Sequence, residues 1–298
     1  MTRLAAIHGE VIAAHGRHYL VEVSPAELRW CVTRGRRSDY ACGDQVLLTP
    51  EGAADGVIES ALPRTSLFSR SVEHRTKLLA ANPTQLAITV ASEPSFSDEL
   101  ITRAAINAHH QGMRTLIVLN KCDLPETDAA RERLHPLLRA GYPLISLSAL
   151  ADVSALRPFL AGERTVLMGQ SGMGKSTLVN ALVPDANTLT AAISTFLDSG
   201  RHTTTASRLY RLDAQSSLID TPGLKEFGLA HLPLNRIARG FPELADWHGT
   251  CRFANCGHRS EPDCGYRQAL DTGAIHPRRF ELMLRVLEAE GSRRSHGH

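Results

Sequence analysis

The residues with the clearest chemical pattern form a glycine-rich segment that ends in Lys-Ser and directly follows an apolar run. They are Gly169, Gln170, Ser171, Gly172, Met173, Gly174, Lys175 and Ser176, followed by Thr177. Backbone N–H groups in such a turn can all point at phosphate oxygens, and the lysine reaches the β- and γ-phosphates. We predict that Ser176 binds magnesium and that Thr177 covers the α-phosphate. The pattern predicts a nucleoside triphosphate site and leaves ATP and GTP open.

A second pattern, Asn120-Lys121-Cys122-Asp123, indicates which base is bound. A carboxylate at Asp123 can accept two hydrogen bonds from guanine N1 and N2, whereas adenine has no matching donors. A site built around a buried carboxylate strongly rejects a ligand that leaves it unpaired. We expect Asn120 to brace the loop and Lys121 to cover the base. By itself, this pattern is also consistent with a turn that caps a strand; beside a phosphate loop it favours GTP.

The dipeptide Ser148-Ala149 follows the next apolar run and fits the short element whose backbone amide meets guanine O6. The order of the motifs is unusual, because residues 120–123 precede residues 169–176 by about fifty positions. In Ras-like GTPases the order is reversed. A circular permutation explains this, since domain termini tend to lie close together at the surface. The sequence therefore predicts an α/β fold with a circularly permuted P-loop GTPase domain.

A third motif, Asp220-Thr221-Pro222-Gly223, is expected to place a carboxylate in the magnesium shell and the Gly223 amide on the γ-phosphate. Leu224 follows, where a Ras-like enzyme carries the glutamine that orients water. Three residues are therefore candidates for catalysis. Lys175 binds the phosphates, Thr204 is the candidate among the switch threonines for closing on magnesium, and His202 could orient water. An exposed loop histidine is an equally good interpretation of His202.

The segment Cys251-x4-Cys256-x-His258-x5-Cys264 carries four ligands within fourteen residues. Three cysteines and one histidine form the ligand set of a closed structural zinc site. Cytosolic thiols stay reduced, so clustered cysteines there indicate a metal site more than disulfides. We predict one structural zinc ion per chain, in addition to the magnesium that accompanies GTP.

The elements expected around these motifs suggest three parts: residues 1–66, 67–227 and 228–298. Five short strands in the first part suggest a barrel of the oligonucleotide-binding (OB) type, although another small β-domain would also fit. The segment from residue 62 to Lys77 has little periodicity and is expected to be a linker. Apolar runs then alternate with helical patterns. The elements expected are strands at 86–90, 114–119, 144–147 and 164–168, helices at 98–109, 129–138 and from 175, a hairpin at 207–219, and a last helix at 277–290.

The composition is that of a globular protein, with 298 residues, 43% hydrophobic and 21% charged. The formal net charge is only +2, so contacts with nucleic acid must come from local basic clusters. The candidates are Arg29, Arg34, Arg36 and Arg37 near the barrel, and Arg278, Arg279, Arg293 and Arg294 around the last helix; solvated surfaces would explain them equally well. No apolar run approaches the length of a membrane span, and the expected state is a cytoplasmic monomer.

The combination of these motifs resembles the ribosome small-subunit-dependent GTPase A family along nearly the whole chain. The permuted order together with the Cys-x4-Cys-x-His-x5-Cys segment is the specific part of the resemblance. It implies an N-terminal OB-fold barrel, a permuted GTPase core and a C-terminal zinc-binding helical domain. It also implies hydrolysis of GTP to GDP and phosphate, stimulated by the small ribosomal subunit and its rRNA, late in maturation of the 30S subunit.

Two other functions are open on the motifs alone. A metabolic P-loop enzyme such as a kinase has no need of the Asn-Lys-x-Asp pattern, and the sequence disfavours it. A nucleotide-gated protein that binds some other RNA would keep every motif and change only the partner.

Overall fold

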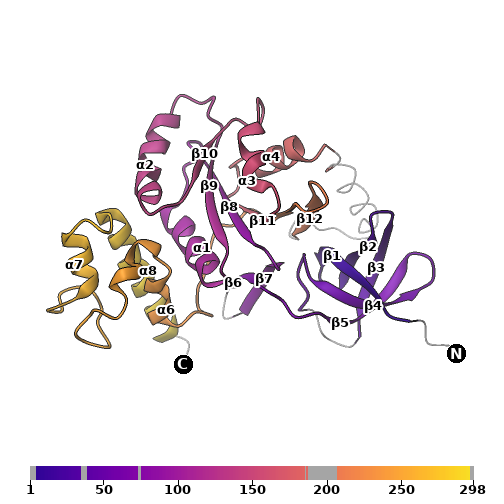
Figure 1. The fold of residues 1–298 in the computed structure, drawn as a ribbon, viewed down its shortest axis with the longest axis horizontal. Helices are drawn as coiled ribbons and strands as arrows, with labels where there is room; N and C mark the ends of the chain where they lie inside the picture. Colours follow the sequence, from indigo (N-terminus) through magenta and orange to yellow (C-terminus); the bar gives the residue numbers. More distant parts are fainter. Residues whose placement is uncertain (1–4, 35–38, 73–74, 185, 187–206, 296–298) are drawn as a thin grey trace.

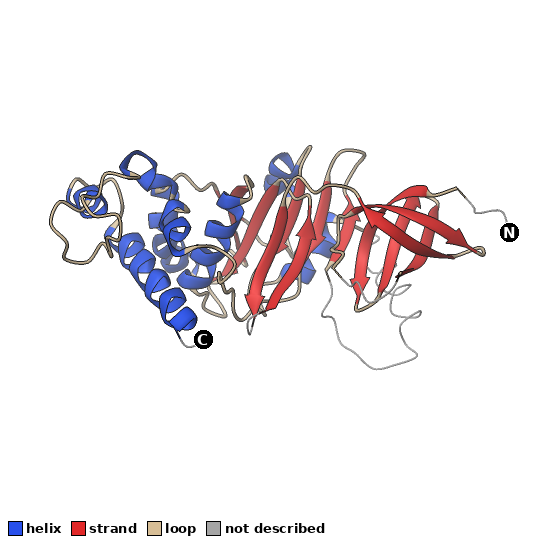
Figure 2. Cartoon of the chain, turned by 90° about the horizontal axis from the view of Figure 1, so that it is seen from below, coloured by secondary structure: helices blue, strands red, loops and turns tan. Residues whose placement is uncertain are grey.

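The computed structural model describes residues 5–34, 39–72, 75–184, 186 and 207–295. Its β-strands form a barrel and a mainly parallel sheet, and a group of helices follows at the C-terminal end (Figure 1). These three regions lie in a row, as Figure 2 shows, with the sheet between the other two. No helix within the described ranges is long and apolar enough to cross a membrane.

The barrel consists of β1 (Ile7–His15), β2 (His18–Ser24), β3 (Glu27–Thr33), β4 (Gln45–Glu51) and β5 (Asp55–Ala61). It closes because β4 pairs with both β5 and β1, while β3 pairs in parallel with β5. Its interior is filled by inward-facing apolar side chains, including Val11, Tyr19, Val21, Val46 and Ile58. The prediction of a five-stranded N-terminal barrel is therefore confirmed.

The prediction of a linker from residue 62 to Lys77 is wrong for its second half, which forms β-strands. β6 (Leu67–Val72) and β7 (Arg75–Ala81) form an antiparallel two-stranded sheet. Phe68 and Leu79 are buried in the core of the central domain, whereas the residues near the turn are polar and basic. The hairpin thus buries only its base, which is why its sequence lacks the regular alternation of a strand.

The central sheet has the order β10-β9-β8-β11-β13-β12. Its first five strands are parallel, and β12 is antiparallel at the edge. The strands are β8 (Gln85–Ala91), β9 (Arg114–Asn120), β10 (Leu144–Ser146), β11 (Arg164–Met168), β12 (Arg208–Arg211) and β13 (Ser217–Asp220). The helices are α1 (Asp98–His110), α2 (Thr127–Arg139), η1 (Ser154–Leu156), α3 (Arg157–Leu160) and α4 (Lys175–Leu182). This confirms the predicted α/β core, including the hairpin of β12 and β13.

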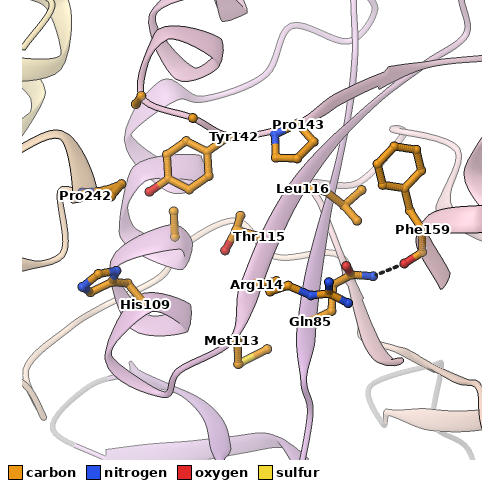
Figure 3. A pocket seen from close by; sticks show the side chains of 13 residues that line it. Gln85, His109, Met113, Arg114, Thr115, Leu116, Tyr142, Pro143, Phe159 and Pro242 are labelled. Atoms are coloured by element: carbon orange, nitrogen blue, oxygen red, sulfur yellow. Dashed lines mark hydrogen bonds between the residues drawn. The ribbon is translucent and has the colours of Figure 1, made fainter. Parts of the chain in front are cut away.

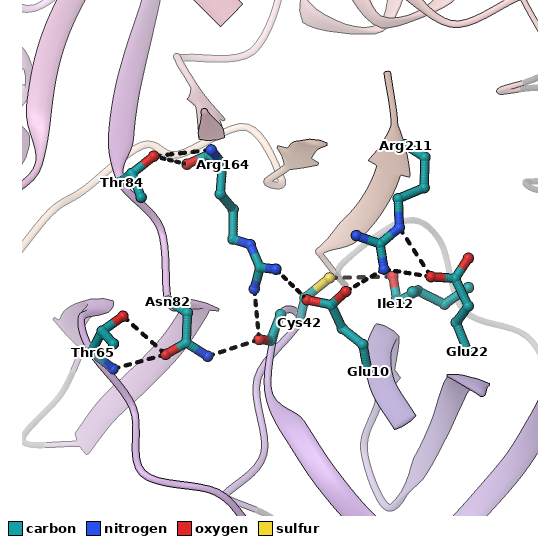
Figure 4. A network of polar contacts seen from close by, with 10 residues as sticks. Glu10, Ile12, Glu22, Cys42, Thr65, Asn82, Thr84, Arg164 and Arg211 are labelled. Carbon is teal, nitrogen blue, oxygen red and sulfur yellow. Dashed lines mark hydrogen bonds and ion pairs between the residues drawn. The ribbon is translucent and has the colours of Figure 1, made fainter. Parts of the chain in front are cut away.

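The barrel and the central sheet are continuous, because β1 also pairs with β12 at Ala13 and Arg208. A polar network reinforces this junction (Figure 4). Glu10, which is 5% exposed, forms ion pairs with Arg164 at the start of β11 and with Arg211 on β12. Arg211 also pairs with Glu22. A nearly buried carboxylate held by two arginines from the central domain fixes where the barrel attaches.

The C-terminal region contains α6 (Leu234–Arg239), η2 (Pro242–Trp247), α7 (Gly265–Asp271) and α8 (Pro277–Ser295). α8 was predicted from the sequence but is longer than expected, and it packs against α6, α1 and α2. α6 and α7 are short and were not predicted. Arg279 on α8 is 2% exposed and forms a bidentate ion pair with Glu243. Its assignment as an RNA-contacting residue is therefore wrong, because its guanidinium holds helices together.

Candidate nucleotide and metal sites

The glycine-rich loop joins β11 to α4, and two of its glycines adopt conformations that other residues rarely adopt. Gly172 and Gly174 both have φ of +83°. A Cβ on Gly174 would lie 2.4 Å from the side-chain nitrogen of Asn120, and one on Gly169 would lie 2.4 Å from the carbonyl oxygen of Thr89. Glycine is therefore needed here both for its backbone freedom and for the close approach of neighbouring atoms.

Asn120 connects the three loops in which the sequence places the nucleotide site. Its Nδ2 donates to the carbonyl oxygen of Met173 at 3.0 Å, and its Oδ1 accepts from the backbone amide of Ala149 at 2.9 Å. Its side chain is buried, so both bonds are shielded from water. This geometry matches the bracing role expected of Asn120. The Ala149 amide already has a partner here, so its contact with guanine O6 stays a prediction.

The rest of the Asn-Lys-x-Asp motif lies in a turn at the carboxyl end of β9. Lys121 has φ of +61°, and its Nζ donates to the carbonyl oxygen of Glu93 at 2.8 Å. Asp123 is exposed, so the expectation of a buried carboxylate is wrong. A hydrogen bond from the Ser148 side chain lowers the pKa of Asp123 below its ordinary value, so it stays an acceptor. Cys122 donates through Sγ to the carbonyl oxygen of Leu119 and helps to close the turn.

Lys175 and Asp220 lie close together beneath the glycine-rich loop. The Lys175 ammonium donates to the carbonyl oxygens of Gly169 and Gln170, at 2.8 and 3.1 Å. Burial lowers the pKa of Lys175, and the charge of Asp220 opposes this. Burial raises the pKa of Asp220 to about 6, which Lys175 and then Arg208 oppose. A buried carboxylate oxygen, Oδ1 of Asp220, has no hydrogen-bond partner among the described residues.

The remaining predicted residues of this site surround the same loop. Gly223 lies against it, because a Cβ there would be 3.2 Å from the Ser171 amide and 3.5 Å from Lys175 Nζ. The side chain of Gln170 accepts from the Ser97 amide at 2.7 Å, at the start of α1. Ser176 is exposed and Thr177 half-buried in the first turn of α4. Leu224 is buried, as expected of a residue that does not orient water.

Four of the arginines predicted as candidates for contact with nucleic acid each form an ion pair with a carboxylate in the structure. Arg29 pairs with Glu27, Arg34 with Glu59, Arg278 with Asp98, and Arg293 with Glu290. Arg36, Arg37 and the side chain of Arg294 lie outside the described residues, as do His202 and Thr204. The roles of these five residues stay predictions.

The second candidate site is a cluster of Cys251, Cys256, His258 and Cys264, whose ligand atoms all lie within 4.8 Å of one another. His258 Nδ1 is 3.6 Å from the sulfur of Cys251 and 3.5 Å from that of Cys264. Burial lowers the pKa of His258, which favours the neutral form that binds metals. The three sulfurs and one imidazole nitrogen therefore have the composition and the spacing of a tetrahedral metal site.

Two residues that the sequence did not suggest hold this cluster in shape. Glu261 accepts hydrogen bonds from the backbone amides of Gly257, Arg259 and Ser260, at 2.6, 2.8 and 3.0 Å. A hydrogen bond from the backbone amide of Glu261 itself, followed by these three, lowers its pKa to about 2. The ring of Tyr266 lies 4.4 Å from that of His258. Neither residue belongs to the set of four metal-binding side chains. The only sequence signal for the role of Glu261 is its position between two of them, His258 and Cys264.

One hollow in the surface is remote from both sites. It has a volume of about 460 Å³ and is mainly apolar; Gln85, Arg114, Tyr142 and Phe159 are among its lining residues (Figure 3). Gln85 and Arg114 begin β8 and β9, whereas the nucleotide motifs follow the carboxyl ends of the strands. In open parallel sheets ligands bind at the carboxyl ends. None of the predicted site residues lines this hollow.

Comparison with known proteins agrees with this geometry. Residues 61–230 match the model of the RsgA GTPase family. A small ribosomal subunit biogenesis GTPase RsgA from Bordetella pertussis is 50% identical over 291 residues, which cover 96% of this chain and 97% of that protein. The protein of the same name from Nitrosomonas europaea is 46% identical, covering 98% of this chain and 93% of its own length.

Two solved structures resemble the chain over almost its entire length. The crystal structure of YjeQ from Thermotoga maritima is 27% identical, with a TM-score of 0.73, covering 96% of this chain and 99% of that one. YloQ, described as a circularly permuted GTPase, has a TM-score of 0.68 at 22% identity, covering 98% and 97% of the two chains. The second likeness shows the shared fold alone.

The close approach of Gly174 to Asn120 generates a prediction. Gly174→Ala places a Cβ 2.4 Å from Asn120 Nδ2, so we expect a loss of unfolding free energy of about 2–4 kcal/mol, from the clash and the left-handed backbone together. Urea denaturation measures this. Gly162→Ala is the matched control, since Gly162 has φ of +73° and nothing within 4 Å of its Cβ position. An equal loss in both variants would assign the effect to the backbone alone.

Proposed function

Because the chain belongs to the RsgA GTPase family, we propose that it acts in the cytoplasm in late maturation of the small (30S) ribosomal subunit. Membership of the family makes the protein a GTP hydrolase, which forms GDP and phosphate. The proposal is that binding to the small subunit and its rRNA stimulates this hydrolysis. The relatives named for small-subunit biogenesis match the chain from the barrel to the cysteine cluster, which supports a shared partner.

The observation that carries the proposal is the pair of bonds made by Asn120. They hold the Asn-Lys-x-Asp turn, the phosphate loop and the Ser148-Ala149 turn together at the carboxyl ends of neighbouring parallel strands. A base bound at Asp123 and phosphates bound at Gly169–Ser176 then belong to one ligand. Adenine lacks the adjacent N1 and N2 donors that Asp123 accepts from guanine, so this ligand is GTP.

Residues of the same site fit a magnesium ion. The unpartnered buried Oδ1 of Asp220 and the hydroxyl of Ser176 are hard oxygen ligands of the kind that magnesium prefers. The ion would neutralise charge on the β- and γ-phosphates. Lys175 binds the same phosphates, and Gly223 offers its amide to the γ-phosphate. In the cysteine cluster, three thiolates and one imidazole favour zinc and leave no ligand position open for catalysis.

Base selection by Asp123 gives one prediction. Asp123→Asn replaces an acceptor of two guanine hydrogen bonds, so GTP affinity should fall about a hundredfold, corresponding to roughly 3 kcal/mol, while xanthosine triphosphate improves. Titration with both nucleotides measures the change. Asp152→Asn is the control, because Asp152 is also an exposed acid whose pKa is lowered by a neighbouring serine, Ser154. Unchanged base preference in the Asp123 variant would refute the assignment.

The metal cluster gives another prediction. Purified protein should contain about one zinc per chain, and Cys256→Ser should reduce this to nearly none, because three ligands hold the ion poorly. The C-terminal region should lose protection from proteolysis while GTP binding persists. Cys31→Ser changes a buried thiol of the barrel and should keep the zinc. Metal-free purified protein with an ordered C-terminal region would contradict this prediction.

Stimulated hydrolysis tests the proposed function directly. GTP turnover should rise when purified small ribosomal subunits are added, and an equal rise with unrelated structured RNA would indicate a different partner.

His202→Ala should lower the stimulated turnover about a hundredfold, while GTP affinity changes little, because water positioning acts in the transition state. His109→Ala, at the exposed end of α1, is the control. Full stimulation of the His202 variant would show that another group positions the water.

A further inference from the structure

The segment that follows Gly223 leads from the phosphate loop to the C-terminal helices by a series of polar contacts. The Leu224 amide donates to the carbonyl oxygen of Gly169 at 3.2 Å. Arg70 on β6 then donates to the carbonyl oxygen of Glu226 at 2.7 Å, and the Ser71 amide donates to that of Gly228 at 3.0 Å. Residues 224–228 are thus attached to the loop at one end and to the β6-β7 hairpin beyond it.

The next residue along this segment contacts α8. The Leu229 amide donates to Oε1 of Glu290 at 3.3 Å. Glu290 is fully buried, and the same oxygen forms ion pairs with Arg103 of α1 and with Arg293 one turn further along α8. A single carboxylate oxygen therefore receives donors from the segment after Gly223, from α1 and from α8.

This arrangement has more polar groups than helix packing requires. Burying a carboxylate and a guanidinium is costly, and an apolar pair of the same volume is often as stable. The second oxygen of Glu290 has no hydrogen-bond partner among the described residues. Gly228 is closely enclosed too, since a Cβ there would lie 2.6 Å from the carbonyl oxygen of Ser71 and 3.2 Å from Arg293 Nη1. Movement of this segment therefore cannot leave Arg293 and α8 unaffected.

We propose that Glu290 is a positioning residue that couples the γ-phosphate sensed at Gly223 to the C-terminal helix α8. The inference rests on the proposed contact between Gly223 and the γ-phosphate. Only five residues lie between Gly223 and Leu229, and three of them, Leu224, Glu226 and Gly228, are held by backbone hydrogen bonds. A shift of Gly223 toward the phosphate is transmitted through this short, hydrogen-bonded segment to the Leu229 amide. Glu290 converts that shift into a displacement of α8 relative to α1.

The test is hydrogen–deuterium exchange of the full chain with GDP and with a non-hydrolysable GTP analogue. In the wild-type protein, the Leu229 amide and the amides of α8 should exchange at rates that differ at least about fivefold between the two nucleotides, the lower end of ordinary coupling between sites. In the double variant Arg103→Leu/Glu290→Leu, which leaves no unpaired buried charge, that ratio should fall to about one. The difference at residues 223–227 should remain.

Matched variants separate coupling from simple stability. Glu290→Gln keeps an oxygen acceptor for Leu229, and Arg103 keeps its pair with Glu99, so most of the nucleotide-dependent difference should be retained. Glu288→Gln changes an exposed acid on the same helix and should have no effect. If Glu290 only stabilised the fold, replacing it would raise the exchange rates of α8 equally with both nucleotides. If circular dichroism shows that the leucine pair does not fold, Glu290→Met removes the acceptor while Arg103 stays paired with Glu99.

The outcomes are decisive in either direction. A nucleotide-dependent difference that persists in α8 without the acceptor overturns the proposal, as does its absence from α8 in the wild-type protein. The proposal is also overturned if Glu290→Gln reduces the nucleotide-dependent difference in exchange at α8 as much as the double variant Arg103→Leu/Glu290→Leu does. Protection of the amides of residues 169–176 by nucleotide serves as the internal reference. If this protection is missing, the proposed GTP site has failed, which is a separate result from failure of the coupling.

Discussion

The candidate nucleotide site depends on the buried side chain of Asn120, which has room for its hydrogen bonds only because Gly174 has no side chain. Asn120 reaches Met173 in the phosphate loop and Ala149 beyond β10, and the path to Met173 is open because Gly174 lacks a Cβ. Three loops from three strands are thereby fixed relative to one another by bonds within the protein itself. Preorganisation of this kind limits the conformational entropy lost when a nucleotide binds. It also explains why a permuted chain can keep the site: the bonds join loops in space, whatever their order in the sequence.

The permutation determines how the other two regions are attached. Because β12 is the edge strand of the central sheet, the barrel can extend the sheet through β1, and the ion pairs of Glu10 fix the junction. Because the chain leaves the sheet through β13 and Gly223, the segment next to the proposed γ-phosphate position leads directly into the C-terminal helices. A GTPase in the usual order would continue from there into its own sheet. Here the same backbone connects the site to a separate region, where Glu290 receives it.

The C-terminal region is held to α1 by buried polar groups as well as by apolar packing. α1 is buried on every side from Leu100 to Ala108, so Arg103 and Asn107 have to find partners inside the protein. Arg103 finds Glu290, while Asn107 donates to the carbonyl oxygen of Ser69 and contacts His231. Directional bonds of this kind fix one arrangement of the helices, where apolar packing alone tolerates several. The metal cluster is organised on the same principle, since Glu261 binds three backbone amides within it.

The sequence by itself determined the permuted α/β core, the five-stranded barrel, the four members of the metal cluster and the loops of the nucleotide site. These follow from spacing and periodicity, which are local properties of the chain. It did not determine the β6-β7 hairpin, the burial of Arg279, the exposure of Asp123 or the partners of Asn120 and Glu290. Each of these depends on which distant segment supplies a partner: Phe68 needs the central core, and Arg279 needs Glu243. A residue's type states which bonds it can make, and only the tertiary structure decides which of them it makes.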